Sequence, residues 1–147
     1  MAQIKTILCA VDFSEHSAQV ADYSQTMANA LGAKVKVLYV APSLTQYVGF
    51  HVPPTSIESF VGEIVSGAEK TMDAFLEERF DKCDAEGAVV TGYAAEEILD
   101  YAQEHKVDMI IMGTHGRKGI DRILFGSVAE KVVQTSSVPV LTIRPSA

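Results

Sequence analysis

The chain has 147 residues, of which 48% are hydrophobic and 21% are charged. The length is close to the commonest size of one domain, and the composition is that of an ordinary globular protein, which excludes disordered, collagen-like and coiled-coil chains. Nineteen acidic against twelve basic residues give a net charge of -7, which excludes nucleic acid and anionic membrane as partners over most of the surface. We expect a single domain over residues 1–147.

Two features bear on the compartment. Cys9 and Cys83 match no metal-ligand spacing and no C-x-x-C redox pair, so we expect two reduced thiols. The first apolar run ends at Asp12, too early for a signal-peptide core, and no later run approaches the roughly 20 apolar residues that span a bilayer. The expected location is the cytoplasm, without membrane insertion.

Five short, β-branched apolar runs alternate with amphipathic segments, which is typical of a parallel sheet with crossover helices. The runs are Ile4 to Val11, Lys34 to Val40, Ala88 to Thr91, Asp108 to Met112 and Pro139 to Ile143. Several are too continuously apolar for a sheet with one wet face. The sequence therefore predicts an α/β fold with helices on both faces of an open sheet.

The amphipathic segments predict four helices. The first begins after Ser14, a good N-cap, and ends at Gly32, where a left-handed residue is expected. The second runs from about Ser56 to Phe80, with a continuous apolar stripe that we assign to the core. The third covers residues 94–106, and the fourth begins at Gly126 and Ser127, with four apolar residues expected to face the sheet, namely Val128, Ala129, Val132 and Val133.

A long connection precedes the second helix. Ala41 to Thr55 contains three prolines and a glycine and shows no periodic pattern. Such a connection in a compact domain is either a functional lid or mobile loop, or a disordered loop without a role. Both interpretations stay open.

A glycine-rich segment follows the fourth apolar run, with the skeleton Gly113-x2-Gly116-x9-Gly126-Ser127. A glycine at the exit of a strand permits backbone angles closed to other residues, and Gly116 lets main-chain N–H groups approach a bulky anion. Gly126 and Ser127 then open a helix, whose N-terminus offers unpaired N–H donors to phosphate oxygens. The alternative is a tight turn without a ligand.

Charge and position favour the binding interpretation. The segment carries three basic residues against Asp121, namely Arg117, Lys118 and Arg122, in a chain that is otherwise negative. The fourth strand is expected beside the first, so Asp12 would lie opposite Gly113 at the point where strand order reverses, which is where doubly wound sheets bind ligands. Asp12 has an alternative role as a turn or capping residue.

These residues resemble the universal stress protein family, specifically its ATP-binding branch. The resemblance spans the chain and rests on Ile7 to Glu15, Val37 to Val40, the glycine skeleton and Val138 to Arg144. It implies a Rossmann-like open parallel sheet of order 3-2-1-4-5. It also implies ATP as the ligand, with Mg²⁺ as an option, and a homodimer formed through the last strand, Val138 to Arg144.

The resemblance also implies a set of site residues. Ala10, Asp12 and Val40 would border the nucleoside, and the remainder would line the phosphates or close the site. The predicted cofactor-binding residues are Ala10, Asp12, Val40, Met112, Gly113, Thr114, His115, Gly116, Arg117, Gly126, Ser127 and Val128. Ala10 stands where some members have proline. No catalytic and no metal-ligating residue is predicted.

Three functions compete. The first is a nucleotide-dependent regulatory switch in the stress response, with an unknown protein partner. The second is a slow ATPase or phosphate transferase with Mg²⁺ held between phosphates, Ser127 and Asp12, for which the chain supplies neither a Gly-x4-Gly-Lys-Ser/Thr loop nor a Gly-x-Ser-x-Gly elbow. The third is an interaction module that uses no nucleotide. The intact glycine skeleton favours the switch, and enzymatic activity stays undecided.

Overall fold

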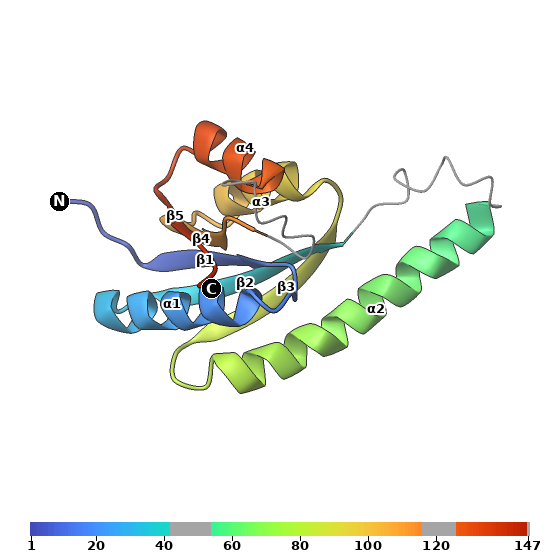
Figure 1. Ribbon diagram of the computed structural model, residues 1–147, viewed down its shortest axis with the longest axis horizontal. Coiled ribbons are helices and arrows are strands. Elements are labelled where there is room, and N and C mark those ends of the chain that lie inside the picture. Colours follow the sequence, from blue (N-terminus) through green and yellow to red (C-terminus); the bar gives the residue numbers. More distant parts are fainter. Residues whose placement is uncertain (42–53, 116–125, 147) are drawn as a thin grey trace.

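The computed structural model (Figure 1) describes residues 1–41, 54–115 and 126–146, the side chains of 54–57 excepted, and strands alternate with helices along these residues. The elements are β1 (Thr6–Val11), α1 (Ser17–Leu31), β2 (Lys34–Ala41), α2 (Pro54–Arg79), β3 (Ala85–Thr91), α3 (Ala94–Glu104), β4 (Met109–Gly113), α4 (Ser127–Thr135) and β5 (Val140–Ile143). The five predicted strands and four predicted helices are all present. Strand β3 begins three residues earlier than Ala88, the predicted start.

The sheet has the order β3-β2-β1-β4-β5, and all its strand pairs are parallel. The predicted fold class and strand order are therefore confirmed. Strand β1 pairs with β2 on one side and with β4 on the other, and in the latter pair Ala10 lies opposite Met112. From β1 the strand order continues to β2 and β3 on one side, and from β4 it continues to β5 on the other. The loops that follow β1 and β4 therefore leave the sheet in opposite directions at its carboxyl edge.

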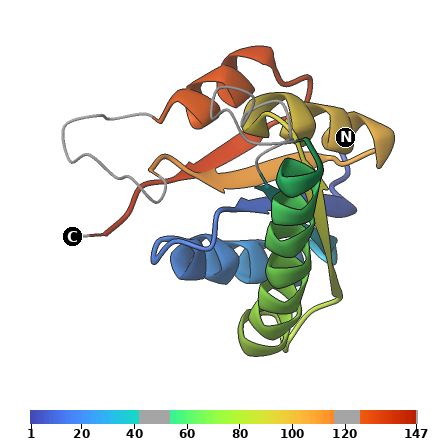
Figure 2. The ribbon, with the colours of Figure 1, turned by 90° about the vertical axis from the view of Figure 1, so that its right-hand side faces the viewer.

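Helices cover both faces of the sheet, as predicted (Figure 2). Ile7, Cys9 and Val11 of β1 belong to the core beneath α1 and α2, whereas Leu8 belongs to the core beneath α3 and α4. Successive strand residues point to opposite faces, so both sets are buried and the runs read as continuously apolar. Among the helices of the described residues, none combines the length and the apolar character that a membrane span requires.

Helix α1 differs from the prediction at its N-terminus and agrees with it at its C-terminus. The helix begins at Ser17 with His16 as its N-cap, and Ser14 lies in the preceding turn, where its carbonyl accepts the Ser17 N–H at 3.0 Å. The prediction of Ser14 as the N-cap is therefore wrong. Gly32 ends the helix in the left-handed region at φ 66, as expected.

Helix α2 has the predicted extent but not the predicted burial. Ala68 and Met72 in its C-terminal half are buried, whereas Phe60 is 49% exposed. The helix of 26 residues is about 39 Å long and β3, with 7 residues, is about 23 Å, so the N-terminal turns extend beyond the sheet (Figure 1).

In α4, Ala129 and Val132 face the sheet but Val133 is 44% exposed, which corrects the fourth predicted contact.

The connection from Ala41 to Thr55 lies outside the described residues except at its ends. Ala41 is the last residue of β2 and is buried, and α2 begins at Pro54. Its two interpretations, lid or loop without a role, stay predictions.

Candidate functional site

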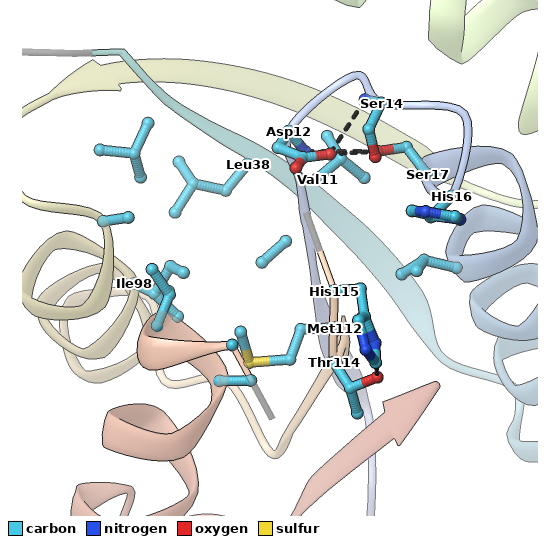
Figure 3. Close-up of a pocket in the computed structure, with 18 of the residues that line it drawn as sticks. Val11, Asp12, Ser14, His16, Ser17, Leu38, Ile98, Met112, Thr114 and His115 are labelled. Carbon is cyan, nitrogen blue, oxygen red and sulfur yellow. Dashed lines mark hydrogen bonds between the residues drawn. The ribbon is translucent and has the colours of Figure 1, made fainter. Parts of the chain in front are cut away.

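A pocket of about 400 Å³ lies where β1, β2 and β4 end (Figure 3). Its walls come from the last residues of these strands, from the turn between β1 and α1, and from the first turns of α3 and α4. This is the edge at which strand order reverses, and ligands of open α/β sheets bind outside the carboxyl ends of the strands at that place. The pocket therefore has the position expected of a ligand site.

Ten of the twelve predicted site residues line this pocket, which are Ala10, Asp12, Val40, Met112, Gly113, Thr114, His115, Gly126, Ser127 and Val128. They come from β1, β2, β4 and α4, which are distant in sequence and adjacent in the fold. Gly116 and Arg117 lie outside the described residues. Contact of any of these residues with a nucleotide stays a prediction.

One side of the pocket is apolar and includes residues that the sequence did not point to. Leu38 lines it from β2, and Ala94 and Ile98 line it from α3. Ile98 was predicted to face the core and is 4% exposed, so it serves both the core and the pocket wall. Helix α3 follows β3 after a short turn, so its first turns necessarily lie at the carboxyl edge of the sheet, and that is the signal that could have identified them. An apolar wall with few polar groups suits a flat ring such as a nucleobase.

Asp12 follows β1 directly and is held by a short turn. Its Oδ1 accepts a hydrogen bond from the Ser14 N–H at 2.9 Å and another from the Ser17 hydroxyl at 3.1 Å (Figure 3). The Asp12 N–H in turn donates to Ser17 Oγ at 3.3 Å. The turn-forming role that was left open as an alternative is therefore real, and Asp12 lines the pocket as well.

Phe13 gives this turn its shape. Its φ of 60 lies in the left-handed region, which costs a non-glycine residue on the order of 1 kcal/mol or more. Its ring packs against Tyr39 at 4.7 Å and Phe75 at 5.7 Å between centroids, and this packing offsets the backbone cost. The reversal at Phe13 brings the Ser14 N–H back to Asp12. The Ser14 hydroxyl oxygen is buried and has no hydrogen-bond partner among the described residues.

A Cβ would be crowded at Gly113 and would have no room at Gly126. The backbone of Gly113 does not have a positive φ, so the expectation of special backbone angles there is wrong. A Cβ at Gly113 would lie 3.3 Å from the His115 carbonyl oxygen and 3.4 Å from Val20 Cγ2. At Gly126 the main-chain N–H donates to the Thr114 carbonyl at 2.6 Å, and a Cβ would lie 2.9 Å from the same oxygen. Glycine lets the start of α4 sit directly on the residue after β4.

The N-terminus of α4 presents main-chain donors to the pocket. Gly126 is its N-cap, no side chain of the described residues caps it, and the helical ladder begins with the Glu130 N–H bonded to the Gly126 carbonyl at 2.9 Å. The N–H groups of the three residues between them, Ser127, Val128 and Ala129, have no partner within the helix, and all three residues line the pocket. Uncapped N–H groups and the helix dipole together favour an anion.

Two histidines also line the pocket. His115 Nδ1 lies 2.7 Å from Thr114 Oγ1, with the direction of the hydrogen bond set by the tautomer, and the Thr114 N–H donates to the Ile143 carbonyl at 3.0 Å. His16 reaches the pocket as the N-cap of α1, with 26% of its side chain exposed. Within residues 1–41, 54–115 and 126–146, His, Cys, Asp and Glu nowhere gather in threes around a possible metal ion.

The matching family model is that of the universal stress protein family, and it covers residues 3–144. The chain belongs to this family. Universal stress protein MJ0531 of Methanocaldococcus jannaschii is 33% identical over 95% of this chain and 82% of its own length. Universal stress protein YxiE of Bacillus subtilis is 32% identical over 94% of this chain and 97% of its own length.

Solved structures of family members have the same fold. Hypothetical protein MJ0577 of Methanocaldococcus jannaschii superposes with a TM-score of 0.85 at 27% identity and covers 99% of both chains. The Archaeoglobus fulgidus universal stress protein in complex with dAMP gives 0.68 at 22% identity, over 97% of this chain and 99% of that one. A universal stress protein in complex with cAMP gives 0.63 at 21% identity, over 99% and 100%. The last two show a shared fold.

Proposed function

We propose that this universal stress protein binds ATP in the pocket at the ends of β1 and β4 and acts as a nucleotide-dependent switch in the stress response. The observation that carries the proposal is the uncapped N-terminus of α4, which opens into the same pocket as Asp12 and an apolar wall. These three features suit the phosphates, the sugar and the base of one ligand.

The proposed arrangement follows from the chemistry of each wall. The base packs against Leu38, Val40 and Ile98, where the pocket is apolar. The Asp12 carboxylate accepts hydrogen bonds from the ribose or the adenine amino group. The phosphates lie along Gly113 and the N–H groups at the start of α4. Each charge-assisted hydrogen bond contributes about 1.5 to 3 kcal/mol before ordering costs, and a micromolar affinity needs about 8 kcal/mol, which four contacts reach at about 2 kcal/mol each.

The family supports an adenine nucleotide as the ligand class. Two members that share this fold are solved with dAMP and with cAMP. The triphosphate, and Mg²⁺ bound with it, are proposed from the sequence resemblance, and two of the predicted ligands, Gly116 and Arg117, lie outside the described residues. In the switch, ATP would order Ala41 to Thr55 or Gly119 to Phe125 and so change a surface for a protein partner. Most of the first segment and all of the second lie outside the described residues.

We also propose that two copies pair through β5, the strand predicted for the dimer. It lies at one edge of the sheet, and its Val140 and Leu141 are half-buried. An edge strand presents unpaired main-chain groups that a second copy can satisfy. A cytoplasmic location stays a prediction from the sequence.

The experiment is isothermal titration of nucleotide-stripped protein with ATP. The wild type is expected to bind with a micromolar dissociation constant. Gly126→Val is expected to weaken binding at least about thirtyfold, or about 2 kcal/mol, because its Cβ would force the start of α4 away from Thr114. Gly62→Ala is the matched control, since nothing lies within 4 Å of a Cβ at that exposed position in α2. Wild-type affinity in Gly126→Val rejects the site.

A further inference from the structure

Ser17, the first residue of α1, is bonded to Asp12 twice. Its hydroxyl donates to Asp12 Oδ1 at 3.1 Å and accepts the Asp12 N–H at 3.3 Å. One hydroxyl thus bridges the main chain and the side chain of the same residue (Figure 3). The bridge fixes the direction of the carboxylate relative to the end of β1.

The bridge is closed to solvent. Ser17 is 2% exposed, so water has little access to take the place of its hydroxyl. The Ser14 N–H holds the same Oδ1 from the other side at 2.9 Å, and that contact depends on the left-handed backbone of Phe13. The Ser17 hydroxyl is the side-chain donor of this pair, and a substitution at position 17 removes it without changing the backbone of the turn.

Comparison with Ser24 shows that this is not the ordinary behaviour of a helical serine. Ser24 is buried on the same helix, and its hydroxyl donates to the Val20 carbonyl four residues back at 2.8 Å. That back-bond is the common local contact of serine in helices. The Ser17 hydroxyl instead reaches five residues back, out of the helix, to the strand end that lines the pocket.

We propose that Ser17 is a positioning residue for nucleotide binding, which acts by holding the Asp12 carboxylate in its binding orientation. The inference rests on the proposed function, because Asp12 is there a contact of the nucleoside. A carboxylate that is already fixed loses less freedom when the ligand binds, and the affinity rises accordingly.

The test is titration with ATP of Ser17→Ala, Ser17→Thr and the control Ser24→Ala, with circular dichroism and thermal unfolding as checks of the fold. Ser17→Ala is expected to weaken ATP binding about fivefold to twentyfold, since a hydrogen bond to a charged group is lost while the Ser14 contact remains. Ser17→Thr keeps the hydroxyl and is expected to stay within about twofold of the wild type. Ser24→Ala is expected to do the same. If Ser17→Ala folds poorly, Ser17→Cys replaces the hydroxyl by a weak donor and carries the same expectation.

A double-mutant cycle separates positioning from a general effect on structure. In an Asp12→Ala background, Ser17→Ala is expected to cause no further loss, because no carboxylate remains to be positioned. An equal loss in both backgrounds overturns the inference, as does wild-type affinity in Ser17→Ala. Absence of ATP binding by the wild type overturns the proposed function and this inference with it, whereas the former two outcomes leave the proposed function standing.

Discussion

Asp12 belongs to the fold and to the candidate site at once. Its Oδ1 closes the turn between β1 and α1 through Ser14 and Ser17, and the same residue lines the pocket. The two roles that the sequence offered for it were treated as alternatives. The structure makes them compatible, because a carboxylate that is fixed by the turn also faces the place where a ligand is expected.

Gly113 and Gly126 show how much the spacing of the glycine skeleton predicts. Their positions at the exit of β4 and at the start of α4 were predicted correctly. Their physical reason was not, since Gly113 needs room beside the His115 carbonyl and Gly126 needs room beside the Thr114 carbonyl. A sequence shows which residues lack a Cβ, but it does not show which atom would meet one.

The two cysteines give a prediction about reactivity. Cys9 is fully buried, and its burial raises the pKa from about 9.0 to about 12. Cys83 is half-buried, and its pKa is raised first by burial and then by Asp84 and Asp81. With an aromatic disulfide reagent at pH 8, the native protein is expected to expose one reactive thiol, Cys83, and the denatured protein two.

The same pKa of Cys9 sets a pH window for stability. The folded pKa of Cys9 lies above the unfolded one, so its contribution to the free energy of unfolding is complete below about pH 9 and is lost as the pH rises toward 12.

In the labelling experiment, rapid reaction of both thiols in the native protein would contradict the burial of Cys9. The variant Cys83→Ser is the control, and its native form is expected to show no thiol that reacts before unfolding.

At the scale of elements, the periodicity of apolar residues predicted which strands and helices form, but it did not predict how far each apolar stripe is buried. The five strands alternate with helices as expected because their apolar runs are buried on both faces. The stripe of α2 was assigned wholly to the core, yet Phe60 is half-exposed because the helix is longer than the sheet beneath it. The start of α1 was missed because Ser14 belongs to the turn closed by Asp12, and its hydroxyl accepts no N–H from the first turn of the helix within the described residues.

The candidate site was predictable to the extent that it follows strand ends. Asp12, Val40 and Gly113 lie where parallel strands terminate, and the strand order brings them together. Ala94, His16 and Ser17 were not predicted as site residues. They line the pocket from the first turns of helices, and no motif marks such residues.

Strand β5 gives a prediction about assembly. The Pro139 and Ile143 carbonyls accept hydrogen bonds from Ile110 and Thr114 of the β4 side, so the main-chain groups of the alternate residues, including Thr142, point to the free edge. Thr142→Pro removes one outward N–H and is expected to convert a dimer to monomer while the domain stays folded. Light scattering coupled to size exclusion measures the mass.

Leu141→Pro is the matched control for this strand. Its N–H points inward to β4, so the variant is expected to lower the melting temperature as well. A wild-type chain that is monomeric at high concentration, or a Thr142→Pro variant that stays dimeric, contradicts pairing through β5.

At the scale of the whole molecule, the fold concentrates favourable sites for an anion in a chain that is negative overall. The net charge is -7, and a phosphate-bearing ligand is repelled by most of the surface. The pocket offsets this with the uncapped N-terminus of α4 at the carboxyl edge of the sheet. Sheet order, helix placement and the two glycines all contribute to this one position, which is why a ligand is expected there.

Amide chemical shifts during an ATP titration test this account most directly, because they locate the ligand as well as detect it. The largest changes are predicted at Thr114, Ser127 and Val128, with smaller ones at Asp12, and with none at Gly62 or Gly67 on α2. Changes that cluster away from the ends of β1 and β4, or an unchanged spectrum at millimolar ATP, would contradict it.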